Sequence, residues 1–494
     1  MKVIIDTSRT VKKLHNFWNH IHFHPTDAIE DDWGKSILDC VAQDNVAQTV
    51  RMYAMLEDIV TMDENGNLQY DFTLNDQRMD YMVSKGFNLL VSYNFMPPCI
   101  SSDPDELATV CKNKTRYKGK FIITAPPRDF ALWEEVCFQY TKHIVQRYGV
   151  EVVSNWYLQC FNEPDISWFF MKGCKDMALR IETYCKLYDA FEHGVRRVSD
   201  TLKIGGPALA REATFLDGLL KHLKENDRKL DYICFHAYGT VPASIESGEK
   251  PLSVYSIVNK VLRVHNICKN NGFEHTPLII DEWGASGIGF VNIDDYPSLI
   301  FRENEVYSAY FARLIMACNA YNLPLDKILI CLSGQHELYN EFSGFRGFFT
   351  LSGFKKPIYN AYALAAKLGG EQLAAITALD NDLLNVLPTR CADGHLAFMF
   401  VYSSEHFDRE LPELKIELDT LGIAGEHTYR KWVIDGETAN GYGAFKKAGY
   451  CEPLNNAQKA EIAKLSENCY TEGKFTSNME FTIKNNGVVL LEVF

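Results

Sequence analysis

Short runs of apolar and β-branched residues alternate with longer amphipathic stretches between about residue 15 and residue 370. The apolar runs predict eight strands, at residues 16–23, 47–55, 88–94, 155–161, 203–208, 232–237, 278–283 and 327–332. The stretches between them have helical periodicity, for example residues 132–148, 176–199 and 303–321. Eight strands that alternate with helices predict an α/β fold, namely a (β/α)8 TIM barrel over residues 15–370.

An open, doubly wound sheet is the competing architecture. Such a sheet usually carries a glycine-rich phosphate-binding turn after its first strand. The residues that follow Phe23 read HPTDAIEDD and contain no glycine. The pattern therefore favours the closed barrel.

The pattern changes after about residue 374, where helical periodicity gives way to short strands with turn residues between them. These strands are predicted at residues 396–402, 415–418, 429–434, 481–484 and 488–493. They predict an accessory antiparallel β-sandwich, with one helical insertion at residues 456–466. A strand at residues 2–6 is expected to pair into the same module, which assigns residues 1–14 and 371–494 to the sandwich domain.

The composition narrows the classes of protein and of partner. With 47% hydrophobic and 23% charged residues, the 494-residue chain has the profile of a globular protein. Its net charge of −14 disfavours nucleic acid and anionic membranes as partners. The sequence has neither an 18-residue apolar run nor a signal-peptide pattern at its start. We therefore expect the 14 cysteines, which form no C-x-x-C pair, to be free thiols of a cytoplasmic protein.

Two of the predicted barrel strands end on a glutamate. Residues 156–165 read WYLQCFNEPD, and Pro164 predicts that the fourth strand ends at Glu163. Residues 277–284 read PLIIDEWG, so that the seventh strand ends at Glu282. The carboxyl ends of barrel strands form the mouth where active sites lie. Two carboxylates that face each other there can act as acid, base and nucleophile on a glycosidic bond.

These two motifs belong to a larger set with a recognisable order. The set also includes FIITAPP at residues 121–127, KIGGPA at 203–208, CFHAY at 234–238 and DGETANGY at 435–442. Together they resemble the β-xylosidase branch of glycoside hydrolase family 39, a family of retaining barrel glycosidases. The resemblance implies hydrolysis of β-xylosides or xylo-oligosaccharides by double displacement, through a glycosyl-enzyme intermediate and without a cofactor. By analogy it also implies a homo-oligomer, namely a tetramer.

The resemblance implies roles for five residues of this chain. Glu163 matches the general acid/base and Glu282 matches the nucleophile. Asn162 matches the residue that binds the sugar 2-hydroxyl, and His236 and Tyr238 match the pair that lines the glycone site.

Two further residues are candidates by their position in the strands. Arg51 on the second strand is expected to point inward, either to hydrogen-bond Glu282 or to pair structurally within the barrel. Trp283, next to Glu282, is expected to line the site and to stack on sugar rings.

Departures from the xylosidase pattern leave the identity of the sugar open. Phe161 stands where Trp is more frequent, and the second strand ends Arg51-Met-Tyr53 where the pattern has Arg-x-His. The eighth strand lacks the expected Trp, and His336 and Glu337 are its candidate substrate-binding residues. A glucoside, galactoside, arabinoside or uronic-acid-bearing glycan therefore remains an alternative substrate. A non-catalytic carbohydrate-binding barrel is the alternative from a different class.

Three histidines alternate along the first strand, at His20, His22 and His24, so that their imidazoles share one face. A His-x-His pair at this place begins the ligand set of metal-dependent amidohydrolase barrels. Of the further ligands that such a site needs, only His236 has a counterpart in the predicted strands. We therefore expect no metal. His22 and His24 are candidate ligands of sugar hydroxyls, and packing within the barrel is the alternative.

Overall fold

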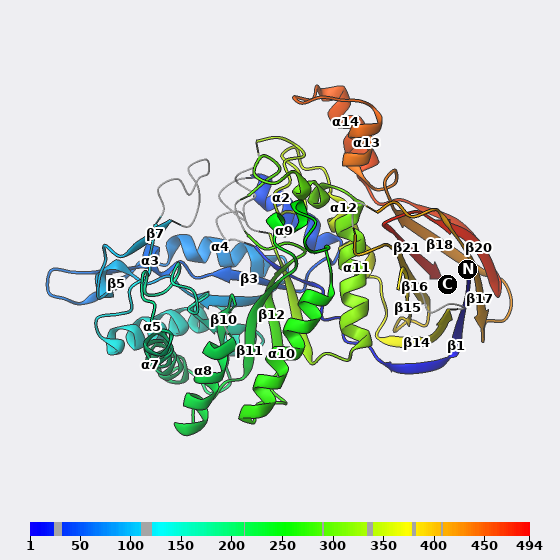
Figure 1. Ribbon diagram of the computed structural model, residues 1–494. Helices are drawn as coiled ribbons and strands as arrows, with labels where there is room; N and C mark the ends of the chain where they lie inside the picture. Colours follow the sequence, from blue (N-terminus) through cyan, green and yellow to red (C-terminus); the bar gives the residue numbers. More distant parts are fainter. Residues whose placement is uncertain are drawn as a thin grey trace.

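The computed structural model of the protein describes residues 1–23, 32–109, 121–211, 213–288, 291–332, 339–377, 382–406 and 409–494. The chain forms a closed eight-stranded barrel and a separate nine-stranded sheet that lies beside it (Figure 1). The N- and C-termini lie close together in the nine-stranded sheet, far from the middle of the barrel.

All eight predicted barrel strands are present, and each pairs in parallel with its neighbours. The barrel closes where the eighth strand pairs with the first, with Leu329 opposite His20. The prediction of a TIM barrel is confirmed. In chain order the strands are β2 (His20–His22), β3 (Thr49–Tyr53), β6 (Asn88–Tyr93), β9 (Tyr157–Cys160), β10 (Lys203–Leu209), β11 (Tyr232–Tyr238), β12 (Leu278–Gly284) and β13 (Leu325–Cys331).

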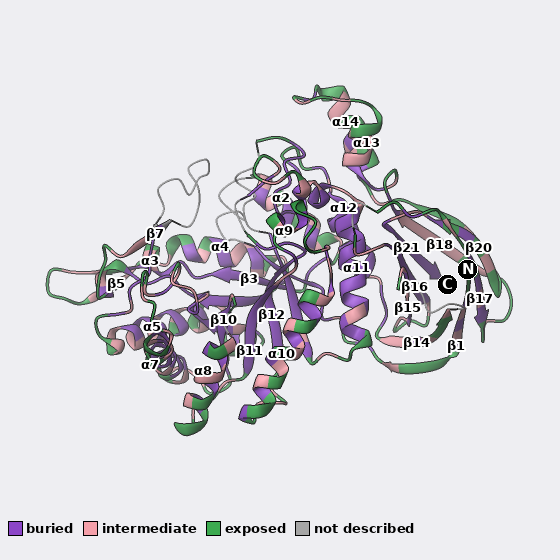
Figure 2. Cartoon of the chain, in the orientation of Figure 1, coloured by how far each residue is buried: buried purple, intermediate pink, exposed green. Residues whose placement is uncertain are grey.

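Helices surround the barrel, whose strands are buried (Figure 2). Most of the helices turn one apolar stripe toward it, whereas α11 (Glu305–Ala320) and α12 (Pro357–Ala365) are buried on nearly all sides. In α8 (Ala213–Glu225), for example, the buried residues are Phe215, Leu216, Leu219, Leu220 and Leu223. The main helices are α2 (Asp32–Gln43), α4 (Thr73–Ser84), α5 (Phe130–Tyr148), α7 (Met177–Arg196), α8 (Ala213–Glu225), α10 (Tyr255–Asn271), α11 (Glu305–Ala320) and α12 (Pro357–Ala365).

Several short elements decorate the loops of the barrel. They are α3 (Leu56–Ile59), α6 (Val150–Val153), α9 (Pro242–Glu246), η1 (Pro98–Ile100) and η2 (Pro297–Glu303), and two ribbons, β4 (Val60–Met62) with β5 (Leu68–Tyr70) and β7 (Leu107–Thr109) with β8 (Phe121–Ile123).

The interior of the barrel is filled by layers of side chains. One layer is a separate small apolar cluster inside the barrel. It contains Leu90, Tyr232, Ile279 and Leu329, with Tyr157 packed against it. Because side chains alternate along a strand, the residues two positions further toward the mouth also point inward. Three of these five residues are polar, namely Ser92, Gln159 and Asp281, and the other two are Cys234 and Cys331. The apolar layer therefore supports a polar layer directly beneath the mouth.

The nine-stranded sheet is mostly antiparallel and contains the first strand of the chain. Its order is β19-β18-β21-β16-β15-β14-β1-β17-β20. β1 runs antiparallel to β14 and parallel to β17. The strands are β1 (Lys2–Lys13), β14 (Glu371–Thr377), β15 (Leu384–Arg390), β16 (Leu396–Tyr402), β17 (Leu414–Leu421), β18 (His427–Ile434), β19 (Tyr470–Phe475), β20 (Asn478–Ile483) and β21 (Gly487–Val493).

This sheet curls over into two layers. Phe400 on β16 and Phe481 on β20 stand five strands apart in the sheet order, yet their rings lie 5.2 Å apart. The accessory sandwich is therefore confirmed, built from one continuous sheet. The division of the chain into domains at residues 1–14, 15–370 and 371–494 remains a prediction.

A helical excursion projects from the sandwich at the top of Figure 1. It contains α13 (Gly441–Lys447) and α14 (Asn456–Leu465), and α14 begins with a capping box between Asn455 and Gln458. The helix predicted at residues 456–466 is thus confirmed. Its inner side packs on the segment that follows β13, through Phe342, Phe354, Leu454 and Ile462.

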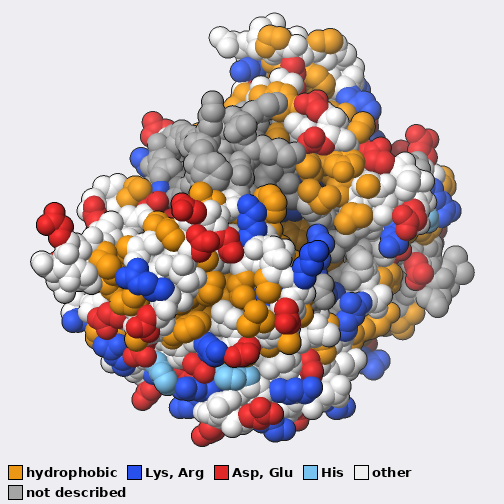
Figure 3. All heavy atoms as spheres, turned by 60° about the vertical axis from the view of Figure 1, so that its left-hand side comes forward, with side chains coloured by type: hydrophobic (Ala, Val, Ile, Leu, Met, Phe, Trp, Pro, Cys, Tyr) orange, Lys and Arg blue, Asp and Glu red, His pale blue; other side chains and the backbone are white. Residues whose placement is uncertain are grey.

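The surface carries charges of both signs. Acidic, basic and hydrophobic side chains are intermixed on the face drawn in Figure 3. Within the described ranges, no helix combines the length and the apolar character that crossing a membrane requires.

Candidate active site

The two motif glutamates lie at the mouth of the barrel, Glu163 just after β9 and Glu282 on β12. Three atoms lie within 4.8 Å of one another: one carboxylate oxygen of Glu163, one of Glu282 and a ring nitrogen of His236. The Nδ1 atom of His236 is 2.7 Å from Oε1 of Glu163 and 3.6 Å from Oε2 of Glu282. Two carboxyl groups from distant parts of the chain therefore share one imidazole.

A tight turn sets the position of Glu163. Phe161 and Glu163 adopt left-handed backbone conformations, with φ of 63° and 48°, which are uncommon for residues other than glycine. The backbone N–H of Glu163 donates to the carbonyl of Ala208 at 3.1 Å, so that the turn is held against the end of β10.

A β-bulge sets the position of Glu282. Along β12, Ile280 pairs with Phe235 and Glu282 pairs with His236, so that Asp281 is the extra residue. The bulge lets Asp281 and Glu282, although consecutive, both reach the interior of the barrel.

Trp283 follows Glu282 in regular register and therefore points outward by the alternation of side chains along the strand, so it does not line the site as expected. Its indole ring is fully buried and stacks on Tyr310 and Phe311 of α11, at 6.4 and 5.9 Å between ring centroids. Its Nε1 donates to the hydroxyl of Tyr362 on α12 at 3.2 Å. Trp283 therefore packs between the barrel and its outer helices.

Three donors hold the carboxylate of Glu282. Oε1 accepts from Nη1 of Arg51 at 2.7 Å and from the hydroxyl of Tyr53 at 3.2 Å. Oε2 accepts from the hydroxyl of Tyr238 at 2.7 Å. Burial alone would raise the pKa of Glu282, but the charges of His236 and Arg51 and the Tyr238 hydrogen bond hold it well below its usual value. Glu282 is therefore ionised at neutral pH.

The guanidinium of Arg51 connects several of the predicted residues and is completely buried. Besides Glu282, its Nη2 donates to Oδ1 of Asn162 at 2.7 Å, and its Nη1 lies 3.0 Å from Nδ1 of His22. Its Nε faces Gln159 and Asp281 at 3.0 and 3.2 Å. Of the two alternatives for Arg51, the hydrogen bond to Glu282 is thus present, and it coexists with the structural pairing.

Glu163 is in the opposite electrostatic situation. Burial raises the pKa of its carboxyl group, the Glu282 charge raises it further, and the contact with His236 offsets only part of this effect. Its pKa lies above the usual value, while 14% of the side chain remains exposed. The site thus combines a carboxyl group that keeps its proton to higher pH with one that loses its proton at lower pH than an ordinary glutamate.

The remaining predicted residues have different outcomes. His22 is buried against Arg51, and burial lowers its pKa to about 3, so that it is neutral. His20 is buried one layer deeper, where Lys327 and Asp326 are its charged neighbours. His24, His336 and Glu337 lie outside the described residues.

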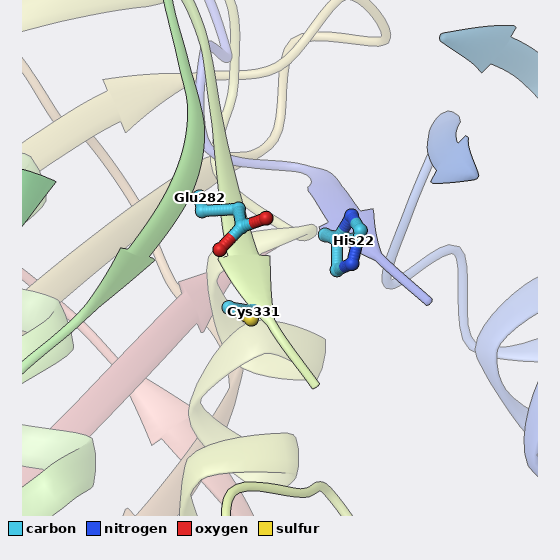
Figure 4. A group of neighbouring side chains, drawn as sticks. All are labelled: His22, Glu282 and Cys331. Atoms are coloured by element: carbon cyan, nitrogen blue, oxygen red, sulfur yellow. The ribbon is translucent and has the colours of Figure 1, made fainter. Parts of the chain in front are cut away.

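His22, Glu282 and Cys331 offer three atoms of metal-ligand type within 4.8 Å (Figure 4). However, Nη1 of Arg51 contacts both His22 and Glu282, and Nη1 of Arg346 lies 3.4 Å from Sγ of Cys331. A metal ion would lie between two guanidinium cations, whose repulsion disfavours it. The donor set therefore fits hydroxyl or anionic groups better than a cation.

Sequence reasoning missed Tyr53, Gln159, Asp281 and Arg346. The first two follow from a period of two, since Tyr53 is two residues after Arg51 and Gln159 is two residues after Tyr157. Arg346 gave no signal, because it lies beyond the last barrel strand. It donates to the hydroxyl of Tyr238 at 3.1 Å and stacks on the Tyr238 ring.

A TIM barrel whose mouth holds two facing carboxyl groups, one with a raised and one with a lowered pKa, is an arrangement of glycosidases. The comparison with protein families makes this specific. The model of Glycosyl hydrolases family 39 matches residues 1–479. The chain belongs to this family and is a glycoside hydrolase.

Individual relatives are distant. A beta-xylosidase of Caldicellulosiruptor saccharolyticus is 25% identical over 388 residues, which cover 76% of this chain and 73% of that protein. An alpha-L-iduronidase of Canis lupus familiaris is 25% identical over 260 residues, which cover 48% of this chain and 36% of that protein. A monomeric beta-xylosidase from Caulobacter crescentus CB15 shares the fold, with a TM-score of 0.82 at 21% identity, covering 100% of this chain and 99% of that one.

Proposed function

We propose that this chain is a retaining β-glycosidase whose first substrate class is the β-xylosides. The observation that carries the proposal is the short separation of the two carboxylates, whose oxygens lie within 4.8 Å of each other. Retaining glycosidases need about 5–5.5 Å between their carboxyl groups, whereas inverting ones need about 6.5–9.5 Å to admit a water molecule.

In the first step, the carboxylate of Glu282 attacks the anomeric carbon. The bond between that carbon and the glycosidic oxygen breaks with its electron pair on the oxygen, which takes the proton of Glu163. In the second step, Glu163, now a carboxylate, accepts a proton from water. The resulting nucleophile displaces Glu282 and restores both groups.

Neighbouring groups support the transition state of both steps. Arg51 donates to Oδ1 of Asn162, so that the amide nitrogen is the end of Asn162 left to bind the sugar 2-hydroxyl. Tyr238 steadies the Glu282 carboxylate through Oε2, so that Oε1 and Oε2 keep a fixed orientation during attack.

A second candidate substrate is a glycan with a uronic acid in the glycone position. The observation that favours it is Arg346, a buried guanidinium that contacts Tyr238 beside Glu282. A guanidinium is well suited to bind a sugar carboxylate. The distant relative from Canis lupus familiaris is named an alpha-L-iduronidase.

The test is the hydrolysis of a panel of aryl glycosides: β-xyloside, β-glucoside, β-galactoside, α-L-arabinoside, β-glucuronide and α-L-iduronide. We expect turnover of the xyloside, loss of all turnover in Glu282→Ala, and a loss of roughly 10²–10⁴-fold in Glu163→Ala. EDTA is expected to leave the rate unchanged. Turnover of a uronide alone would select the second candidate, and a folded protein without any turnover would contradict both.

We also propose that the protein is cytoplasmic and that it assembles as a homotetramer. The location is supported by the cysteines, since the thirteen that fall in the described ranges are free thiols. The assembly rests on analogy, and the relative from Caulobacter crescentus CB15 is described as monomeric. Light scattering on the purified protein measures the mass directly. A monomer in solution would contradict the tetramer.

A further inference from the structure

Asp281 is a completely buried carboxylate in the layer beneath the two glutamates. Its Oδ2 accepts from Nε2 of Gln159 at 2.5 Å and lies 3.2 Å from Nε of Arg51 and 3.6 Å from Nε2 of His236. Among the described residues, its Oδ1 has no hydrogen-bond partner. A buried carboxylate is costly unless it compensates other charges, so its neighbours indicate what it does.

His236 lies between Asp281 and Glu163, with Nε2 toward the former and Nδ1 bonded to the latter. Three carboxylic side chains face its ring: Asp281 and Glu282 from β12, and Glu163 after β9. His22 from β2 is neutral, and Tyr238 lies on the same strand as His236. Burial would lower the pKa of His236, but the charges of these carboxylates raise it well above its usual value.

Three cations surround the carboxyl groups of the site, Arg51, Arg346 and His236. Asp281 offsets part of this positive charge. Loss of the Asp281 charge would increase the buried positive charge, and His236 is the group that can relieve this by losing a proton, because a guanidinium does not deprotonate in proteins.

We propose that Asp281 is a positioning residue: it keeps His236 as an imidazolium and thereby places the acidic proton of Glu163 on Oε2. An imidazolium has two N–H donors and no acceptor. Its Nδ1–H donates to Oε1 of Glu163, so Oε1 cannot direct a proton toward the ring. The proton of Glu163 then resides on Oε2, the oxygen left to face the glycosidic bond.

A neutral His236 would have the opposite effect. With its proton on Nε2, facing Asp281, its Nδ1 becomes an acceptor for the O–H of Glu163, and the acidic proton points away from the substrate. In the productive form, the Oε2–H bond breaks, its electron pair remains on Glu163 and the proton moves to the glycosidic oxygen. The imidazolium then stabilises the carboxylate that is left. This inference rests on the acid role of Glu163 proposed above.

The test is Asp281→Asn, which removes the charge and retains the shape. We expect the alkaline limb of the kcat/KM profile to move down by about one pH unit or more. In this variant the limb reports the loss of the His236 proton rather than that of Glu163, because removal of an opposite charge this close lowers the pKa of His236 by about 1–3 units. The loss of kcat should be largest for poor leaving groups and smallest for a 2,4-dinitrophenyl glycoside, since the latter leaves without a proton.

Asp326→Asn is the matched control. Asp326 is also a barrel carboxylate and accepts from the hydroxyl of Tyr157 at 2.8 Å, but it lies at the opposite, amino-terminal end of β13. It should leave the alkaline limb unchanged. An unmoved limb in Asp281→Asn, with equal losses for all leaving groups, would overturn the inference.

His236→Asn provides a second measurement that does not depend on the folding of Asp281→Asn. The amide can donate to Oε1 of Glu163 but carries no charge, so the pKa of Glu163 rises and the alkaline limb should move up. The two variants thus move the limb in opposite directions. A limb that does not rise in His236→Asn would contradict the inference, whereas an inactive wild-type protein would contradict the proposed function itself.

Discussion

Glu163 and Glu282 have the same side chain, yet their surroundings move their pKa values in opposite directions. Glu282 receives hydrogen bonds from Arg51, Tyr53 and Tyr238, and these favour its charged form. Glu163 is buried beside that negative charge, and these two effects outweigh its contact with His236, so that its protonated form is favoured on balance. A gap between the two pKa values is what divides a carboxylate pair into an acid and a nucleophile.

The activity should therefore depend on pH as a bell-shaped curve, and Tyr238→Phe tests its acid limb. The acid limb lies below the usual glutamate range because the pKa of Glu282 is lowered, and the alkaline limb lies above it because the pKa of Glu163 is raised. Loss of the Tyr238 hydrogen bond raises the pKa of Glu282. Since hydrogen bonds to charged groups contribute about 1.5–3 kcal/mol, the acid limb should rise by about one to two pH units.

The measurement is kcat/KM from about pH 3 to about pH 9. The alkaline limb serves as the internal control, because it reports Glu163. Tyr53→Phe should raise the acid limb less, since its hydroxyl is 3.2 Å from Glu282, compared with 2.7 Å for Tyr238. An acid limb that stays in place in Tyr238→Phe would show that this hydrogen bond does not set the pKa.

At the residue scale, the sequence predicted the positions of both glutamates. It did not predict which faces of the strand Asp281 and Trp283, the neighbours of Glu282, occupy. Strand ends are readable, because Pro164 ends one strand and an aliphatic run ends at Glu282. A bulge is not readable from a strict period of two, which would place Asp281 and Trp283 on the same face. In the structure they lie on opposite faces. The sequence therefore does not reveal Asp281, and it points to Trp283 only because that residue adjoins Glu282.

At the scale of elements, the segment after β13 owes its position to a buried ion pair. Nζ of Lys356, at the start of α12, donates to Oε1 of Glu303 at 2.7 Å, and the same oxygen accepts from the backbone of Gly344 at 2.7 Å. Both side chains are almost completely buried. The pair holds the backbone that leads to Arg346, and so connects this segment to the mouth of the barrel.

Lys356→Met should destabilise the protein by about 3–5 kcal/mol, because it leaves the carboxylate of Glu303 buried without its cation. The double variant Lys356→Met/Glu303→Gln should recover much of this loss. Urea denaturation measures the free energy of unfolding. Lys415→Met is the control, since its pair with Glu480 is exposed and such pairs contribute about 0–1 kcal/mol. Equal losses of unfolding free energy in Lys356→Met and Lys415→Met would contradict the prediction.

The elements themselves were predictable where packing and local pattern agree. The eight barrel strands are buried, mostly aliphatic runs that alternate with amphipathic helices, and α14 carries its own capping signal at Asn455 and Gln458. The ribbons of β4 with β5 and β7 with β8 were not predicted. Each of their strands has three residues, too few for a period to appear.

At the scale of the whole molecule, the sandwich shares a hydrophobic core with the barrel. Along β16, Ala397, Met399 and Val401 belong to the core cluster of the barrel, whereas Phe398 and Phe400 belong to that of the sandwich. The strand is buried on both faces, so the barrel and the sandwich cannot separate here without exposing apolar surface. We therefore expect the barrel and the sandwich to unfold together, although their boundaries read as those of two domains.

Ile5→Ala tests this coupling from within the sandwich. Ile5 on β1 is completely buried in the core of the sandwich, between β14 and β17. Its truncation should cost about 2–5 kcal/mol, and Val11→Ala, on the same strand but 55% exposed, should change stability by about 0.5 kcal/mol or less.

Circular dichroism follows the melting of the whole chain, and residual glycosidase activity after heating follows the barrel. If the two modules form one cooperative unit, Ile5→Ala lowers both transition temperatures by the same amount, because the sandwich cannot melt while the barrel stays folded. Activity that survives above the melting transition of Ile5→Ala would instead show that the barrel is an independent domain.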